Sequence, residues 1–283
     1  MVARLFRVQE VTSSNLAFPT KEKKMELIKR EKAQFDKRIH EIDLFRGFLI
    51  LLVIFDHLMW FFNYYIFHNQ SGALNWYWQS EARFIVRQVV LMAFLFTCGI
   101  SCHLSRNNKK RGTLLALLCI GITIATHLLQ LIPLFNGRVV IVDFNILGVV
   151  ALSILLYCIF EKRSNVDLYI LVGALFIFYI FLLVGNIGNT DTTYYPFRSI
   201  LYTNFNLTKE GYVADYLTLF PYVIFLFLGV LFARKYYPNK ESLIKHKGNW
   251  ERAFCFMGRH TLLIYVAHEV LFTLIFMLIG LII

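Results

Sequence analysis

The chain has 283 residues, of which 58% are hydrophobic and 17% aromatic, with a mean hydropathy of +0.57. This composition excludes an ordinary soluble domain and calls for several helices that lie in lipid. The net charge of +11 taken alone suits a nucleic-acid-binding protein, but its distribution along the chain does not.

The basic residues are concentrated in every second connection between the apolar segments. Most of the 29 Lys and Arg residues lie in the stretches 1–42, 105–112, 161–166 and 234–254, whereas the alternate connections carry Arg138, Arg198 and Lys209. Cytoplasmic loops of membrane proteins carry an excess of Lys and Arg. The pattern therefore predicts a cytoplasmic amino terminus, the lipid bilayer as a partner, and no nucleic acid.

Residues 1–37 are expected to form a basic cytoplasmic tail, followed by a transmembrane domain over 38–283. The first 24 residues have neither the apolar core nor the cleavage site of a signal peptide. Met25 opens a basic, helix-prone stretch and is a second candidate for the first residue, so no function is assigned to residues 1–24.

Seven apolar segments follow, each close to the ~20 residues that a membrane-spanning helix needs. They are expected at about 44–66, 83–104, 113–134, 139–160, 167–186, 213–233 and 258–281. No alternating β pattern competes with them, and open strands are excluded from lipid. The sequence therefore predicts an all-α integral membrane protein, a bundle of about seven transmembrane helices with its carboxyl terminus outside.

The first apolar segment carries a polar stripe. Asp43 and Arg46 lie at its start, and Asp56 and His57 lie near its far end. At about 100° and about 1.5 Å per residue, Arg46 and His57 share one helix face and lie roughly 16 Å apart. Ionisable groups within lipid are costly unless they are paired or line a wet cavity, so these side chains are candidates for function.

Two histidines are candidates for proton transfer, because histidine is easily poised as a base near neutral pH. His57 lies within the first segment, and His68 lies in the outer connection that follows it. Each also has a plainer interpretation, with His57 as a helix-packing residue hydrogen-bonded to a neighbour and His68 as a solvated loop residue. Residue type alone leaves both alternatives open.

Arg83 and Arg87 lie four residues apart at the outer end of the second segment. Asp56 is expected at a similar depth, so an Asp56–Arg87 pair is predicted to neutralise both charges. Arg83 is then expected to snorkel to the interface, and Arg87 remains an equal candidate for a substrate contact. The aromatic run 76–78 is predicted to be an interfacial belt.

Four cations gather in the inner connection after the second segment, namely Arg106, Lys109, Lys110 and Arg111. Their plainest role is to fix the topology of the chain. Their functional role would be to hold the phosphates of a cytosolic ligand such as a coenzyme A nucleotide.

The remaining candidates lie in the last segment and among the cysteines. His268 and Glu269 fall deep in the hydrocarbon region, where a carboxyl group needs a partner across the bundle. The five cysteines, at positions 98, 102, 119, 158 and 255, are odd in number and have no C-x-x-C spacing. They predict neither a disulfide framework nor a zinc site, and no metal is expected.

Four short motifs follow one another along the chain. They are Asp43-Leu-Phe-Arg-Gly47, Phe96-Thr-Cys-Gly-Ile-Ser101, Ala214-Asp-Tyr-Leu-Thr-Leu-Phe-Pro-Tyr222 continuing to Gly229, and Gly258-Arg-His-Thr-Leu-Leu-Ile-Tyr-Val-Ala-His-Glu269. Together they resemble the heparan-α-glucosaminide N-acetyltransferase catalytic domain, over about residues 38–281. The resemblance implies transfer of an acetyl group from acetyl-CoA in the cytosol to an amino sugar on the other face of the membrane.

The resemblance also implies roles for single residues. By its spacing from the first motif, His68 matches the family's catalytic histidine, and His57 stands where the eukaryotic enzymes have asparagine, so His57 is expected to assist. The stretch Phe144-Asn-Ile-Leu-Gly148 has glycine where bacterial members commonly have histidine. The chain also lacks the lumenal domain of the eukaryotic enzymes, so the identity of the acceptor is left open.

We therefore expect an integral membrane acyltransferase, in a bacterial inner membrane, that passes an acetyl group from acetyl-CoA to an amino sugar or another cell-envelope glycan. The sequence leaves open whether the protein forms a homodimer. The catalytic residues are expected to be His68 and His57. The residues expected to bind the donor or the acceptor are Asp43, Arg46, Arg83, Arg87, Arg106, Lys109, Lys110, Arg111, His268 and Glu269.

Two other classes of protein are alternatives to the acyltransferase interpretation. A small transporter or channel would use the same intramembrane charges, although the chain shows no inverted repeat of the kind common in transporters. A structural protein that has lost its activity is the third alternative, and the glycine at position 148 supports it.

Overall fold

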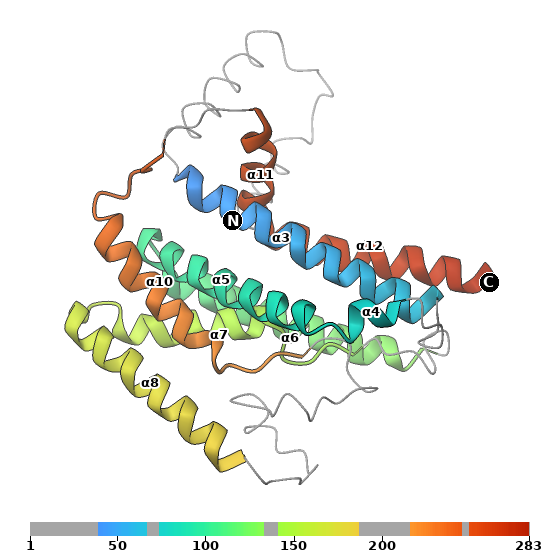
Figure 1. Ribbon diagram of the computed structural model, residues 1–283, viewed down its shortest axis with the longest axis horizontal. Helices are drawn as coiled ribbons and strands as arrows, with labels where there is room; N and C mark the ends of the chain where they lie inside the picture. The colour runs from blue at the N-terminus through green and yellow to red at the C-terminus, as the bar shows by residue number, and fades with distance from the viewer. Residues whose placement is uncertain (1–38, 67–73, 133–140, 187–215, 245–248, 283) are drawn as a thin grey trace, which may run out of the picture.

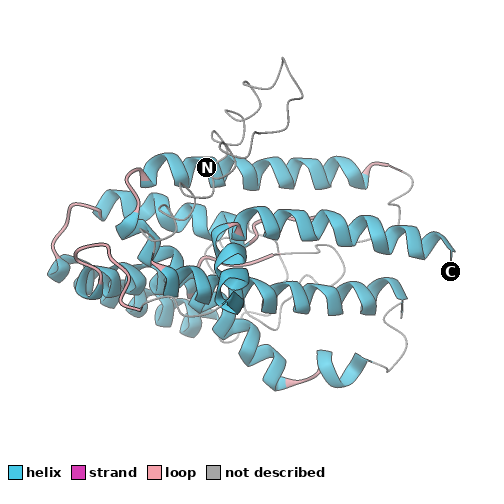
Figure 2. Ribbon diagram, turned by 90° about the horizontal axis from the view of Figure 1, so that it is seen from above, coloured by secondary structure: helices cyan, strands magenta, loops and turns pink. Residues whose placement is uncertain are grey.

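The computed structural model describes residues 39–66, 74–132, 141–186, 216–244 and 249–282, and within these ranges it contains helices and no strand (Figures 1 and 2). The helices are α3 (His40–Phe61), the π-helical turn η1 (Phe62–Ile66), α4 (Asn75–Trp78), α5 (Glu81–Leu104), α6 (Asn108–Gln130), α7 (Ile146–Phe160), α8 (Asn165–Asn186), α10 (Tyr222–Tyr236), α11 (Asn249–Arg259) and α12 (Thr261–Ile282). The predicted all-α class is confirmed.

Four helices are long and apolar enough to cross a membrane, namely His40–Tyr64, Glu81–Leu104, Asn108–Gln130 and Asn165–Gly185. Helices α11 and α12 together make a fifth candidate, bent by 83° between Arg259 and Thr261. Helices α7 and α10 have 15 residues each. At about 22 Å they are shorter than the ~30 Å of hydrocarbon in a bilayer. Four or five of the predicted seven spans are therefore supported, and these long apolar helices mark an integral membrane protein.

The short helices form the centre of the bundle. Helix α7 packs against α5, α6 and α10, and its residues Val149 and Ile154 are fully buried. Helix α8 lies at the edge of the bundle (Figure 1), where the side chains of Ile177 and Phe181 are 69% and 70% exposed. Exposed apolar side chains of this kind on a long apolar helix are suited to contact with lipid.

Two pairs of helices cross at reciprocal glycines. Gly99 of α5 lies against the backbone of Leu226 in α10, and Gly229 of α10 lies against the backbone of Phe96 in α5. A Cβ atom added at either glycine would overlap the carbonyl oxygen that it faces. Small residues are what allow two membrane helices to approach this closely.

Helices α3 and α11 cross in the same way. Gly47 faces the backbone of Phe254, and Gly258 faces the backbone of Asp43. Asp43 is buried at this crossing, with 7% of its surface exposed. The glycines of the sequence motifs therefore mark the points where the helices touch.

The predicted sixth and seventh segments begin later than expected. Helix α10 starts at Tyr222 rather than near 213, because Pro221 precedes it and a proline ring does not fit inside a helix. The last long helix starts at Thr261, after the bend, and α11 stands across α3 and α12 (Figure 1). Helix α11, which lies partly in the predicted basic connection 234–254, is thus a separate helix.

Candidate functional site

A cavity of about 350 Å³ lies between α3 and α5, with Ile146, Leu217 and Tyr265 also on its wall. Most of its lining is apolar, and the polar groups on its wall include Asp56, His57, Arg83 and Arg87. An apolar pocket with a few convergent polar groups is the usual form of a small-molecule site. The far end of the predicted polar stripe therefore opens into this cavity.

Asp56 is held by Arg83. The Arg83 guanidinium donates from Nε to Oδ1 at 2.8 Å and from Nη2 to Oδ2 at 3.1 Å, and the Tyr77 hydroxyl donates to Oδ1 at 2.6 Å. The guanidinium also lies over the Trp78 ring, 3.9 Å from its centroid. Burial, followed by the hydrogen bond to Asp56, raises the pKa of Tyr77 to about 12. Tyr77 therefore stays a hydrogen-bond donor at neutral pH.

This arrangement corrects the predicted Asp56–Arg87 pair. Helix α5 begins at Glu81 with Ser80 as its N-cap, so Arg83 stands in the first turn beside Asp56 and does not snorkel away. Arg87 lies one turn deeper and lines the cavity, and no described residue gives its guanidinium a hydrogen bond or close ion pair. The aromatic run 76–78 belongs to this site, where the sequence indicated only an interfacial belt.

We predict that the Asp56→Asn and Arg83→Gln substitutions each lower the free energy of unfolding by about 2 kcal/mol, because each leaves a partly buried charge unpaired. The double variant should lose less than the sum of the two. Denaturant titration in detergent measures all three, with Lys235→Gln, which removes an exposed charge at the end of α10, as the control that should add independently to Asp56→Asn. Strict additivity of Asp56→Asn and Arg83→Gln would show that the two side chains are not partners.

His57, which lines the cavity, contacts His268 and Glu269 of α12. His57 Nδ1 lies 2.9 Å from His268 Nε2 and in close contact with Glu269 Oε1, and the two imidazole rings stack at 18°. His268 Nδ1 donates to the Ile264 carbonyl at 3.0 Å, so a neutral His268 turns an unprotonated Nε2 toward His57. The Glu269 carboxylate, which lies in a long apolar helix, thus has the partner across the bundle that its cost in lipid requires.

The three groups fix the tautomer of His57. A carboxylate and the Nε2 lone pair of His268 both accept, so the atom between them, His57 Nδ1, is the one that carries the proton. The other ring nitrogen of a neutral His57 then holds a lone pair. A histidine oriented by a carboxylate in this way is the usual arrangement of a general base.

The other predicted cations divide between two environments. Arg46 of α3 and Arg111 of α6 both reach Cys98, at 3.8 Å to its sulfur and 3.5 Å to its carbonyl oxygen. The Arg46 Nε atom is buried without a hydrogen-bond partner. Arg106, Lys109 and Lys110 are exposed at the start of α6. Two guanidinium groups therefore converge at the end of the polar stripe opposite to His57.

Two further predicted positions are His68 and Gly148. His68 falls outside the described residues. Gly148 lies in α7, does not line the cavity, and has no room for a larger side chain, because an added Cβ would lie 2.7 Å from the Phe144 ring. The absence of a histidine at position 148 therefore removes no group from the cavity wall.

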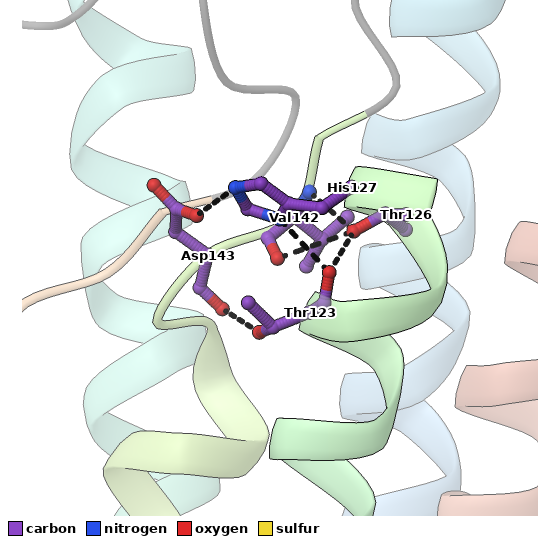
Figure 3. A network of polar contacts seen from close by, with 5 residues as sticks. All are labelled: Thr123, Thr126, His127, Val142 and Asp143. Carbon is purple, nitrogen blue, oxygen red and sulfur yellow. Dashed lines mark hydrogen bonds and ion pairs between the residues drawn. The ribbon is translucent and has the colours of Figure 1, made fainter. Parts of the chain in front are cut away.

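A second histidine–carboxylate pair joins the end of α6 to the segment before α7 (Figure 3). His127 Nε2 lies 3.6 Å from Asp143 Oδ1, and His127 Nδ1 donates to the Thr123 carbonyl at 2.9 Å. Thr126 donates to, and accepts from, the backbone of Val142. The His127 side chain is 50% exposed, so this network ties two segments together at the surface rather than forming a buried site.

The chain matches no curated protein and no solved structure. The sequence model described as "Heparan-alpha-glucosaminide N-acetyltransferase, catalytic" matches residues 38–270. This match starts just before α3 and reaches past Glu269, so it includes the four motifs, the cavity and both groups of charged residues. The chain therefore belongs to the heparan-alpha-glucosaminide N-acetyltransferase catalytic domain family, whose acetyl donor is acetyl-CoA.

Proposed function

We propose that this protein transfers an acetyl group from cytosolic acetyl-CoA to an amino sugar of a cell-envelope glycan on the other face of the membrane. The observation that carries the proposal is the His57–Glu269–His268 group, whose His57 lines an intramembrane cavity, in a chain of an acetyltransferase family. We place the chain in a bacterial inner membrane with the basic connections in the cytoplasm.

His57 accepts the proton. As the acceptor amine attacks the thioester carbonyl, the unprotonated ring nitrogen of His57 takes a proton from it, and Glu269 stabilises the imidazolium that forms. A carbon–nitrogen bond forms, the carbon–sulfur bond breaks, and the coenzyme A thiolate leaves and takes up the proton that His57 removed from the amine, which restores the neutral imidazole. We keep His68 as a second catalytic residue, on the outer side, because the family motif assigns a histidine at its position.

Arg46 and Arg111 hold the donor. Both guanidinium groups converge on Cys98. The buried Arg46 Nε–H group has no hydrogen-bond partner among the described residues and can donate to a phosphate oxygen. The exposed Arg106, Lys109 and Lys110 add positive charge beside them. Along α3, Arg46 and His57 are separated by roughly 16 Å, a distance that an extended pantetheine arm spans. Donor phosphates and reacting thioester thus fit the two ends of one stripe.

Coenzyme A is expected to raise the melting temperature of the purified protein, and the Arg46→Gln and Arg111→Gln variants should bind it at least about tenfold more weakly, because each loses a charge-assisted hydrogen bond. Thermal shift against coenzyme A concentration measures this. Lys235→Gln is the matched control, since it removes one exposed positive charge from the end of α10. Equal stabilisation of all variants by coenzyme A would contradict this donor site.

A further inference from the structure

We propose that His57, His268 and Glu269 also form a binding site for a divalent transition-metal ion, best suited to Zn²⁺, and that the bound ion blocks proton transfer by His57. The blocking rests on the proposed function, whereas the binding of the ion does not. The cysteines gave no reason to expect a zinc site, and this group contains no cysteine.

The geometry of the three donor atoms carries the proposal. One ligand atom from each side chain lies within 4.8 Å of the others, and His268 Nε2 lies 3.3 Å from Glu269 Oε1. Among the described residues, this is the one group of three or more His, Cys, Asp or Glu side chains whose ligand atoms come this close together. Two histidines and one glutamate, with a fourth position open, are a common ligand set of zinc enzymes.

The surroundings favour an ion as well. His268 donates its Nδ1 proton to the Ile264 carbonyl, and a hydrogen bond of this kind to a backbone carbonyl typically orients a metal-binding histidine. His268 is buried, and His57 lines the cavity, which gives an ion a route to the group. Imidazole and carboxylate ligands together favour zinc over magnesium or calcium.

Metal binding and base catalysis exclude one another at His57. A neutral His57 that binds the ion through Nδ1 must carry its proton on the other ring nitrogen, which then has no lone pair. The ion takes the place of the proton that otherwise lies between His57, His268 and Glu269. The bound state is therefore expected to lose the acid–base part of catalysis, typically at least ~10²-fold.

The test uses the purified full chain, stripped with a chelator and then loaded with Zn²⁺ or Co²⁺. We expect one more zinc ion per wild-type chain than in His268→Ala or Glu269→Gln, measured by elemental analysis after desalting. The wild-type Co²⁺ complex should show the intense d–d bands of a four-coordinate site without the charge-transfer band of a thiolate ligand. That spectrum separates this site from the five cysteines.

The matched control is His127→Ala, which disrupts the surface pair with Asp143 and should bind as much zinc as the wild type. Melting temperatures without metal show whether each variant is folded. If the variants are not folded, the Co²⁺ spectrum of the wild type alone tests whether the metal site exists. Equal zinc in wild type, His268→Ala and Glu269→Gln, or no four-coordinate Co²⁺ spectrum, would overturn the site. Zinc bound without loss of acetyl transfer would overturn the blocking, and absence of acetyl transfer in the metal-free protein would instead overturn the proposed function.

Discussion

Replacing His57 with leucine is expected to lower acetyl transfer at least ~10²-fold, the usual loss when acid–base catalysis is removed. The substitution deletes the ring nitrogen that takes the proton and leaves Glu269 without the His57 Nδ1 group that it contacts across the bundle. Transfer from labelled acetyl-CoA to a panel of amino sugars, with the protein in detergent or nanodiscs, measures the effect. Coenzyme A binding should be retained, because Arg46 and Arg111 lie at the other end of the stripe.

Two further variants separate the roles. His57→Asn cannot take the proton and should lose activity by about the same factor as His57→Leu, but it should be the more stable of the two because asparagine can still hydrogen-bond to Glu269. His68→Ala should also lose activity, because the proposed mechanism gives His68 a catalytic role, and its melting temperature shows whether the variant is folded. Full activity of His57→Leu would remove His57 from the mechanism, and full activity of His68→Ala would remove His68.

Gly229→Ala is expected to cost about 3 kcal/mol or more, enough to prevent recovery of folded protein, because its methyl group would overlap the backbone carbonyl oxygen of Phe96. Relief would require α5 and α10 to separate along their whole crossing, and a reciprocal contact at Gly99 resists this. Fluorescence-detected size-exclusion chromatography and thermal unfolding measure the loss.

Gly121→Ala in α6 and Gly173→Ala in α8 are the matched controls, since an added Cβ meets nothing within 4 Å at either position. Alanine has the higher helix propensity by ~1 kcal/mol, so these variants should be unchanged or slightly more stable. A Gly229→Ala protein as stable as these controls would contradict the close crossing of α5 and α10.

The sequence predicts the class of the fold and the positions that matter most, because both depend on local patterns. Apolar runs of the right length identify the long helices, and the family motifs contain Gly47, Gly99, Gly229 and Gly258, the four glycines at the helix crossings. The cost of a buried carboxylate likewise indicates that Glu269 needs a partner. None of these inferences requires knowledge of which helices are neighbours.

What the sequence does not reveal depends on tertiary placement. The partner of Asp56 was assigned from equal depth in the membrane, but the N-cap at Ser80 starts α5 early enough to bring Arg83 beside Asp56 instead. Helix α11 carries Glu251, Arg252 and Arg259, which place most of it in the predicted basic connection, so its packing against α3 is not evident from the sequence. The meeting of His57 with Glu269 arises only because α12 packs on α3.

The most direct measurement is acetyl transfer across the membrane of proteoliposomes that contain the purified protein. With labelled acetyl-CoA on the side of the basic connections and an amino sugar on the other side, we predict that N-acetylated sugar accumulates on the sugar's side and free coenzyme A on the donor's side. The same vesicles with the His57→Leu protein should form at least ~10²-fold less product. Folded protein that binds coenzyme A yet acetylates no amino sugar of the panel, or that does so equally well without His57, would contradict the account.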